Sequence, residues 1–280
     1  MSLEAGSVEP GGGPRSEEGP RGPSRRALVT GASSGIGRAF ADRLARDHYD
    51  LCVVARSEDR LTALAAELRA RSGIAVEVWP ADLTDEAEVT RLVEALGERP
   101  PDLLVNNAGL GTVGPFAELD PAGEEREVRL NVLAPLRLTR AALPGMIERG
   151  HGAIVNVSSL AGISPAPYTA TYAASKAFLT SFTEAVYEEL RGSGVRVQAL
   201  LPGFTRTEFQ DRAGIDKSQI PSFAWLSPEA VVEASLASLA RGEVICVPGA
   251  GYRVLSGLQR LAPRSLTRRF LAAAMRRTLS

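Results

Sequence analysis

Tyr172 and Lys176 stand four residues apart in a run whose residues favour a helix. Residues at this spacing share one helical face, so the phenol and the ammonium would be neighbours. A phenol has an ordinary pKa near ~10, and a fixed cation beside it favours the phenolate and lowers that pKa. The pair could therefore act as a proton shuttle in acid–base catalysis. A chance pair on a surface helix has the same spacing, so this motif alone does not decide between the two.

A glycine-rich turn follows a short apolar run, Arg26 to Thr30, early in the chain. The turn reads Gly-Ala-Ser-Ser-Gly-Ile-Gly over residues 31–37 and leads into a helical pattern that continues through Ala45. Strand, glycine turn and helix in this order favour a dinucleotide site, because glycines let the backbone approach a pyrophosphate and the helix start offers free N–H donors. The spacing differs from the commoner Gly-x-Gly-x-x-Gly. This motif alone therefore does not distinguish a dinucleotide site from an ordinary turn.

Two further motifs follow along the chain. The run Asn-Asn-Ala-Gly at 106–109 comes directly after the apolar run 103–105, and Ser159 precedes Tyr172 by thirteen residues. With the glycine-rich turn and the Tyr/Lys pair, these motifs make the chain resemble a classical short-chain dehydrogenase/reductase (SDR) from about residue 26 to residue 249. The resemblance implies an oxidoreductase that transfers a hydride between a nicotinamide cofactor and a carbonyl or alcohol.

The resemblance also implies a catalytic tetrad of Asn131, Ser159, Tyr172 and Lys176. Tyr172 would exchange the proton with the substrate oxygen, while Lys176 would lower the pKa of Tyr172 and hold the nicotinamide ribose. Ser159 would donate a hydrogen bond to the substrate oxygen; its neighbour Ser158 lacks the family's spacing to Tyr172. Asn131 would bend its helix and anchor a water that leads to Lys176.

The implied cofactor-binding residues lie in short segments along the chain. The glycine-rich turn would hold the diphosphate, and the segment 106–109 would support the central sheet beside the cofactor. Pro202, Gly203 and Thr207 resemble the segment that holds the nicotinamide carboxamide. The pair Asp82 and Leu83 also belongs to the implied cofactor-binding residues. Apart from the residues at the end of the second predicted strand, these are Gly31, Ser33, Ser34, Gly35, Ile36, Gly37, Asp82, Leu83, Asn107, Ala108, Gly109, Tyr172, Lys176, Pro202, Gly203 and Thr207.

The end of the second predicted strand bears on the choice of cofactor. NAD-binding sites usually place an acidic residue there, whereas this chain has Arg56 and Ser57. A guanidinium fork and a hydroxyl suit a 2′-phosphate, so NADP(H) is favoured and NAD(H) is disfavoured. Asp82 and Leu83 resemble the family's pair at the adenine, although Asp82 could instead, or in addition, cap a helix that starts near Thr84.

Composition excludes several other classes of function. The chain has 280 residues, 44% of them hydrophobic, and a net charge of −1, which gives no argument for a nucleic-acid partner. Cys52 and Cys246 lie in apolar runs and are expected to be buried and free, not paired in a disulfide. His48 and His151 are the only histidines, and without a Cys/His cluster we expect no metal.

Apolar runs and helical patterns alternate along the chain, which predicts an α/β fold. We expect a single domain with a Rossmann-like, doubly wound parallel sheet of about seven strands. Long helices are expected near 122–149 and 170–192, and residues 203–228 read as a substrate lid or, alternatively, an inert surface insertion. The expected strands are 26–31, 50–55, 74–80, 102–106, 152–158, 194–200 and 243–247.

Loops expected near the pocket are rich in apolar and aromatic residues, which favours an apolar small-molecule carbonyl or alcohol over a sugar phosphate. Many of these residues could equally belong to the core. They are Leu110, Val113, Phe116, Leu160, Ile163, Pro165, Phe204, Phe209, Phe223 and Trp225.

The two ends differ from the domain at 25–250. Residues 1–24 are rich in Gly, Pro, Ser and Glu and are expected to be a disordered tail. Residues 251–280 form a basic amphipathic extension without Asp or Glu, which could contact a membrane surface or pack on the protein body, and we favour packing. The sequence shows no secretory signal or membrane span, so a cytoplasmic location is expected.

Three classes of function stay open at this point. The favoured one is an NADP-dependent oxidoreductase. The others are a catalytically silent dinucleotide-binding regulatory protein and a membrane-peripheral protein dominated by its basic tail. The predicted long helices carry more apolar residues than one sheet can cover, among them Leu136, Leu143, Phe178, Phe182 and Val186, so a homodimer or homotetramer is also expected.

Overall fold

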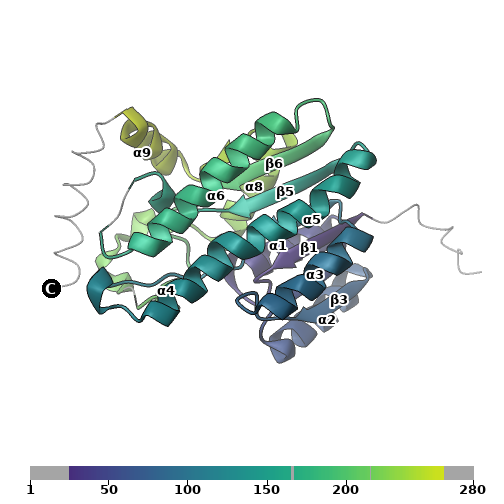
Figure 1. The fold of residues 1–280 in the computed structure, drawn as a ribbon, viewed down its shortest axis with the longest axis horizontal. Helices are drawn as coiled ribbons and strands as arrows, with labels where there is room; N and C mark the ends of the chain where they lie inside the picture. The colour runs from purple at the N-terminus through teal and green to yellow at the C-terminus, as the bar shows by residue number, and fades with distance from the viewer. Residues whose placement is uncertain (1–24, 165–166, 215, 262–280) are drawn as a thin grey trace, which may run out of the picture.

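The structure is a computed structural model that describes residues 25–164, 167–214 and 216–261. Its centre is one sheet of seven strands in the order β3-β2-β1-β4-β5-β6-β7 (Figure 1). Every neighbouring pair of strands is parallel, which confirms the predicted Rossmann-like, doubly wound sheet. The strands are β1 (Arg26–Thr30), β2 (Asp50–Ala55), β3 (Val76–Pro80), β4 (Leu103–Asn106), β5 (Gly152–Val157), β6 (Val195–Leu200) and β7 (Ile245–Cys246).

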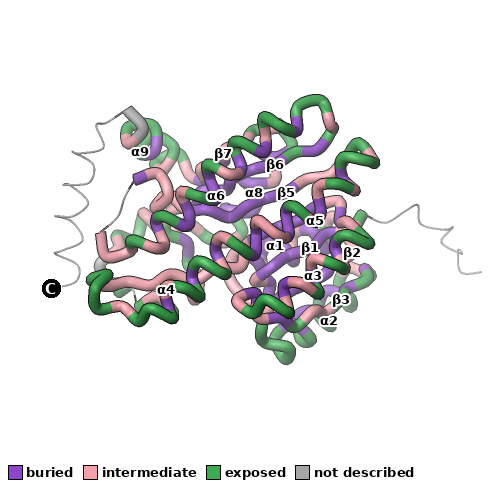
Figure 2. Tube along the Cα trace, in the orientation of Figure 1, coloured by how far each residue is buried: buried purple, intermediate pink, exposed green. Residues whose placement is uncertain are grey.

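Helices cover both faces of this sheet. Successive strand side chains alternate between faces, so Ala27 and Val29 of β1 join one buried cluster while Leu28 joins the other. The first cluster includes side chains of α1 (Gly35–Arg46), α2 (Glu58–Ser72) and α8 (Pro228–Ala240), and the second includes those of α3 (Glu86–Glu98), α5 (Ala134–Glu148) and α6 (Ala170–Glu189). Figure 2 shows the strands β1, β2, β4, β5 and β6 buried along most of their length, which explains why their sequences are largely apolar, whereas most of the edge strand β3 is not buried.

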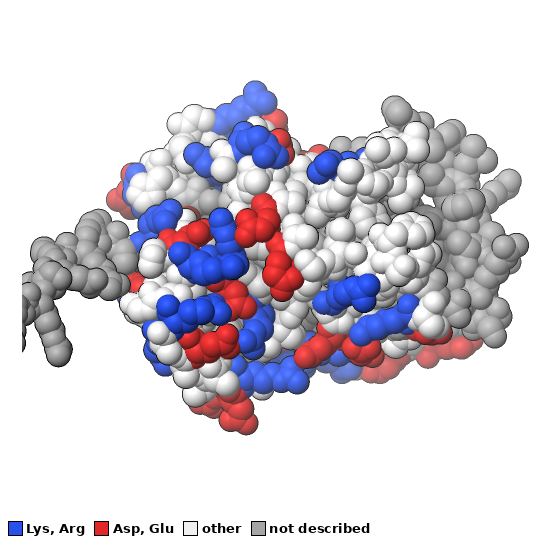
Figure 3. Space-filling view, turned by 180° about the vertical axis from the view of Figure 1, so that it is seen from behind, with Lys and Arg blue, Asp and Glu red and all other residues white. Residues whose placement is uncertain are grey.

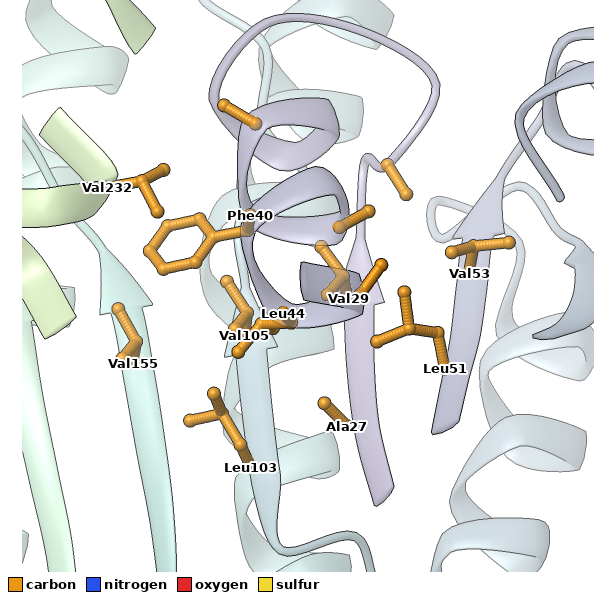
Figure 4. Close-up of a cluster of buried hydrophobic side chains, with 14 of the residues drawn as sticks. Ala27, Val29, Phe40, Leu44, Leu51, Val53, Leu103, Val105, Val155 and Val232 are labelled. Carbon is orange, nitrogen blue, oxygen red and sulfur yellow. The ribbon is translucent and has the colours of Figure 1, made fainter. Parts of the chain in front are cut away.

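Phe40 and Leu44 anchor α1 to the first face of the sheet. Both side chains are buried, and in Figure 4 Phe40 points from α1 toward Val155 and Val232. Truncation of such residues to Ala typically costs about 2–5 kcal/mol of stability. Because α1 begins at the end of the glycine-rich turn, this packing also holds the turn against the sheet.

The strand order reverses between β1 and β4. β1 pairs with β2 on one side and with β4 on the other, and Val29 lies opposite Val105 in the register. In open α/β sheets, ligands bind beyond the carboxyl ends of the strands at such a reversal. We refer to this edge of the sheet, where the strands end, as the carboxyl rim.

The two long helices differ in detail from the prediction. The helix expected near 122–149 is interrupted, because α4 (Pro121–Val128) is followed by a π-helical segment, Arg129–Leu133, before α5 begins. A π segment accommodates a wider turn in the helix and often occurs at functional sites. The helix expected near 170–192 is α6, which ends at Glu189.

In its described residues, 203–214 and 216–228, the segment at 203–228 contains only short elements before α8. They are α7 (Phe209–Arg212) and 3₁₀ turns at Lys217–Gln219 and Ser222–Ala224. Glu208, at the start of α7, pairs with Arg60 of α2 at 3.0 Å. The segment therefore reaches across the carboxyl rim to the helix that follows β2.

The C-terminal extension is described only in part. Helix α9 (Ala250–Leu261) packs on the segment after β6, since the Tyr252 hydroxyl donates to Ala224 O at 2.6 Å and accepts from Phe204 N at 3.2 Å. Residues 262–280, including the basic positions predicted there, and the predicted tail at 1–24 lie outside the described residues. Within the described part of the chain, every helix is too short or too polar to cross a bilayer.

The back of the molecule carries acidic and basic side chains next to one another (Figure 3). Arg38 of α1 pairs with Glu67 of α2 at 2.6 Å, and Arg71 of α2 pairs with Asp42 of α1 at 2.7 Å. Exposed pairs of this kind typically contribute about 0–1 kcal/mol each, so they add little to the apolar core between these helices.

Candidate functional site

The glycine-rich turn is held tightly against the segment after β4. Asn107 Nδ2 donates to Thr30 O at 2.8 Å and to Gly31 O at 3.3 Å. Thr30 Oγ1 in turn accepts from the backbone N–H groups of Asn107 at 2.9 Å and Ala108 at 3.0 Å. A Cβ atom at Gly37 would lie 2.3 Å from Gly31 O, so only glycine fits there. The turn is thus a backbone cradle next to a helix start, which suits a diphosphate.

Arg56 and Ser57 lie at the end of β2, where the sequence predicts a 2′-phosphate contact. Both side chains are exposed. Neither makes a hydrogen bond or ion pair with another described residue, and Ser57 precedes the first turn of α2 without capping it. They fit an anionic group, because a free guanidinium and a free hydroxyl can both bind phosphate oxygens.

Asp82 does not cap the helix that follows it. Its Oδ1 accepts from Thr84 N at 2.9 Å and from Thr84 Oγ1 at 2.8 Å, which makes a local turn. The helix α3 starts two residues later than expected, and Asp85 caps it by accepting from Glu88 N at 3.0 Å. The alternative that Asp82 caps a helix near Thr84 was therefore wrong.

Three of the predicted tetrad residues lie on α6 or in the turn after β5. Lys176 is buried, and its Nζ donates to Val157 O at 2.9 Å and lies 5.8 Å from the centroid of the Tyr172 ring. Ser159 follows β5 and hydrogen-bonds through its side chain with Tyr172. The neighbouring Ser158 has a different role, because its Oγ donates to Lys176 O at 2.7 Å within the core.

Asn131 lies at the centre of the π-helical segment and is buried. Its Nδ2 donates to Leu110 O at 2.8 Å and to Ser175 Oγ at 3.1 Å, while its Oδ1 accepts from Leu110 N at 3.1 Å. A Cβ atom at Gly109 would lie 3.2 Å from Asn131 Oδ1 and 3.4 Å from Lys176 Nζ. The structure thus brings all four predicted tetrad residues to one part of the carboxyl rim.

Burial dominates the proton affinities of the Tyr/Lys pair. Loss of solvent raises the pKa of Tyr172 to about 12, an effect that the Ser159 hydrogen bond opposes and the charge of Glu127 increases. Loss of solvent lowers the pKa of Lys176 to about 8, which the charge of Glu127 opposes. The expected lowering of the Tyr172 pKa by Lys176 is therefore not found in this geometry. At neutral pH the phenol is protonated and the amine is still cationic.

Sequence reasoning missed Glu127 and Thr112. Glu127 is fully buried, and its Oε2 accepts from Thr112 N at 2.9 Å and from Thr112 Oγ1 at 2.7 Å. Its Oε1 accepts from Asn131 Nδ2 at 3.4 Å. The spacing of four residues between Glu127 and Asn131 was the available signal, because it places both on one helical face.

The segment after β6 contributes several aromatic residues, and one of them, Phe209, lies next to Tyr172. The rings of Phe209 and Tyr172 have centroids 5.5 Å apart, and those of Phe204 and Trp225 are 5.9 Å apart. Phe116, Phe204 and Phe223 are exposed. Thr207 contacts the glycine-rich turn, since a Cβ atom at Gly35 would lie 2.9 Å from Thr207 Cγ2. Pro165 lies outside the described residues.

Metal and thiol chemistry have no candidate groups in the described part of the chain. No cluster of three or more His, Cys, Asp and Glu side chains is arranged there to hold a metal ion. Cys52 and Cys246 are buried and free, as predicted. Burial raises the pKa of the Cys52 thiol to about 12, so it is not a nucleophile at neutral pH.

Comparison with known proteins gives a consistent family. A family model described as short chain dehydrogenase matches residues 25–218. A very-long-chain 3-oxoacyl-CoA reductase of Anas platyrhynchos is 32% identical over 218 residues, which cover 76% of this chain and 68% of that protein.

Two solved structures are also similar. A short-chain dehydrogenase from Sphingobium yanoikuyae in complex with NADPH has a TM-score of 0.78 and 40% identity, covering 84% of this chain and 94% of the other. A bulky-bulky ketone specific alcohol dehydrogenase from Comamonas testosteroni has a TM-score of 0.73 and 34% identity, covering 80% of this chain and 86% of the other.

Proposed function

The chain belongs to the short chain dehydrogenase family, and from this premise we propose that it is an NADP-dependent oxidoreductase acting on apolar carbonyl or alcohol substrates. One observation carries the proposal. A protonated phenol, a buried lysine and a serine hydroxyl lie together at the same rim of the sheet as the glycine-rich turn. A proton donor beside a dinucleotide cradle is the arrangement that carbonyl reduction requires.

The residues take separate roles in this proposal. The cofactor, when bound, supplies or accepts the hydride. Tyr172 holds the proton that the substrate oxygen receives in reduction, and Ser159 donates a hydrogen bond to the same oxygen as negative charge grows there. Lys176, whose buried ammonium lies 5.8 Å from the centroid of the Tyr172 ring, would hold the nicotinamide ribose. Asn131 keeps the turn after β4 in place through its bonds to Leu110.

The preference for NADP(H) over NAD(H) rests on Arg56 and Ser57. Both are exposed at the end of β2, and neither is engaged by another described side chain. The place where NAD-binding sites carry an acidic residue is thus open to a phosphate. The relative from Sphingobium yanoikuyae, solved with NADPH, supports the same choice.

An apolar substrate is supported by the aromatic residues of the segment after β6, one of which, Phe209, lies next to Tyr172. Exposed rings such as Phe204 and Phe223, with relative exposures of 43% and 88%, would lose contact with water against an apolar substrate. The names of two relatives, one acting on long-chain 3-oxoacyl-CoA and one on bulky ketones, agree with this class. A catalytically silent regulatory protein is not favoured, because no tetrad residue is replaced.

We also propose that the protein forms a homodimer or homotetramer through α4, the π segment and α6. Val128, Leu133 and Phe178 are exposed there, and Phe178 stacks on Phe182 with ring centroids 5.8 Å apart. Val186 does not contribute to this face, because it is buried in the core. Light scattering tests the proposal: Phe178→Glu should give a smaller species than the wild type, and a wild-type monomer at micromolar concentration would refute it.

Two further expectations stay predictions. One is a cytoplasmic location, and the other is that the basic C-terminal extension, of which residues 262–280 lie outside the described residues, packs on the protein body and not on a membrane surface. Flotation of the full chain and of residues 1–252 with anionic liposomes tests the second. Equal flotation of both would remove the extension from membrane binding.

The proposed function is tested by mixing the full chain with NADPH and a panel of carbonyls and following NADPH absorbance. The panel contains a long-chain 3-oxoacyl thioester, a ketone with two bulky substituents and a keto sugar. We expect consumption of NADPH with the two apolar ketones, little with the keto sugar, and weaker activity when NADH replaces NADPH. Tight binding of NADPH without turnover of any carbonyl would favour the silent regulatory alternative.

A further inference from the structure

Glu127 is a carboxylate in an unusual place. Its relative exposure is 0%, and it lies at the end of α4, beside the π-helical segment that carries Asn131. Buried carboxylates are rare, because an ionised group loses its hydration and must be compensated by hydrogen bonds or an opposite charge. A chain that needed only packing at this position would carry an apolar residue.

The contacts of Glu127 lead in two directions. Its Oε2 holds Thr112, through a backbone N–H at 2.9 Å and a hydroxyl at 2.7 Å, and thereby fixes the turn after β4. Its Oε1 accepts from Asn131 Nδ2 at 3.4 Å, and the same amide donates to Ser175 Oγ, next to Lys176, at 3.1 Å. One carboxylate is thus connected both to the loop that borders Tyr172 and to the helix that carries Lys176.

We propose that Glu127 is a positioning residue for the reaction, whose buried carboxylate holds the turn 109–112 and Asn131 in place and serves as the counter-charge of the Lys176 ammonium. Only the expected effect of Glu127 on the rate of carbonyl reduction rests on the proposed function. The charge coupling between the two residues can be measured whether or not the protein reduces a carbonyl.

The ionisable groups around the pair support this assignment. Burial raises the pKa of Glu127, while the Thr112 hydrogen bonds and the charge of Lys176 oppose that rise. Glu124, one turn earlier on α4, acts on Glu127 with the same sign of charge. Glu127 favours the charged form of Lys176 and disfavours the charged form of Tyr172, so both members of the Tyr/Lys pair respond to it.

The consequence of the counter-charge has a definite sign. With Glu127 ionised, Lys176 keeps its proton to higher pH, and the cation next to Tyr172 persists. Glu127→Gln keeps an oxygen that can accept from Thr112 but removes the charge, so the pKa of Lys176 should fall. In carbonyl reduction the alkaline limb of the rate profile should then move to lower pH, with up to about ten-fold lower kcat on that limb.

The chain offers a direct measurement of this coupling, because Lys176 and Lys217 are its only lysines. Selective ¹³C labelling of lysine therefore gives two side-chain signals, and the signal of Lys217 serves as the internal reference. We expect the titration midpoint of Lys176 to fall in Glu127→Gln and to stay or rise in Glu124→Gln, the matched control from the same helix. Thr112→Val removes a hydrogen bond that favours ionised Glu127, so it should lower the midpoint less than Glu127→Gln does.

The outcomes separate the inference from the proposed function. A Lys176 midpoint and an alkaline limb that are both unchanged in Glu127→Gln would overturn the inference, even in an active enzyme. A shifted midpoint in a wild-type protein that reduces no carbonyl would keep the charge coupling and overturn the proposed function. Thermal unfolding of each variant identifies a loss of fold, and in that case Glu127→Asp, which keeps the charge, should restore the Lys176 midpoint.

Discussion

The carboxyl rim has two halves that are built in different ways. On the side of β1 and β4, the glycine-rich turn and Asn107 are joined by hydrogen bonds of 2.8–3.3 Å, and the space beside Gly37 has no room for a Cβ atom. On the side of β6, the segment that follows is made of short turns, and Phe204 and Phe223 expose their rings. Backbone atoms define the first half, and side chains on a loop define the second.

This difference teaches how one fold can keep its cofactor and change its substrate. A backbone cradle tolerates almost no substitution, because its donors are fixed by the strands and by the turn itself. A wall of side chains on a surface loop can be replaced without disturbing the sheet. We therefore expect mutations in the first half to affect every substrate alike and mutations in the second half to affect some substrates only.

Tyr172 lies at the border between the halves, and its loss should have the largest effect on catalysis. Tyr172→Phe keeps the ring and its contact with Phe209 but removes the proton, so kcat should fall by at least ~10²-fold for every substrate. NADPH binding, followed by fluorescence, should change little. Tyr187→Phe, on the same helix, is the matched control, and wild-type turnover in Tyr172→Phe would exclude this residue from proton transfer.

Gly37→Ala tests the rigidity of the first half, which contains the glycine-rich turn. The new Cβ atom would lie 2.3 Å from Gly31 O and 2.4 Å from Asn107 Nδ2, so the turn must shift. Overpacking of this kind typically costs about 1–3 kcal/mol. If this whole cost falls on the binding of the cofactor to the turn, NADPH should bind roughly ten- to hundred-fold more weakly.

The control for this mutation is Gly97→Ala in α3, where no atom lies within 4 Å of the new Cβ. An alanine inside a helix is more favourable than a glycine, so this variant should be stabilised by about 0.5–1 kcal/mol in thermal unfolding. Unchanged NADPH affinity in Gly37→Ala would show that the glycine-rich turn can shift to accommodate the Cβ atom without loss of cofactor binding.

The arrangement of the first half was also the part that the sequence predicted best. Glycines, Asn107 and the strand ends are close in sequence to the elements that place them, so their spacing carries the information. The strands follow from apolar runs that alternate with helical patterns for the same reason. The start of α3 was misjudged, because Asp82 and Asp85 are both good capping residues and only their distances to the backbone distinguish them.

Two features of the site depend on contacts that no local pattern encodes. Glu127 is buried because Thr112, fifteen residues earlier on a loop, folds back onto it, while in the sequence it looks like one more charge on a polar helix. The π-helical segment at Asn131 is set by hydrogen bonds to Leu110 and Ser175 on other elements. The pKa of Tyr172 was also misjudged, since the effect of burial depends on the packed structure.

Arg56→Ala separates the two cofactors within the first half. Only NADPH loses a charge-assisted hydrogen bond, typically about 1.5–3 kcal/mol, so its affinity should fall by roughly ten- to hundred-fold, while that of NADH should not change. Arg140→Ala, exposed on α5, controls for the general loss of positive charge. Titration of both cofactors by fluorescence gives the two affinities, and equal weakening of NADPH and NADH would reject the contact with the 2′-phosphate.

The smallest effect is expected in the second half of the rim, at Phe223. This ring has a relative exposure of 88%, so Phe223→Ala removes little core packing and should leave thermal unfolding unchanged. If a bulky apolar ketone covers part of the ring, the lost burial should raise KM by about three- to ten-fold, a fraction of the roughly 1.5–3 kcal/mol for complete burial of such a side chain. For a small ketone that does not contact the ring, KM should stay the same, as should the affinity for NADPH. An equal rise in KM for small and bulky ketones would show that Phe223 acts through the shape of the whole loop, and the two halves of the rim would then not be independent.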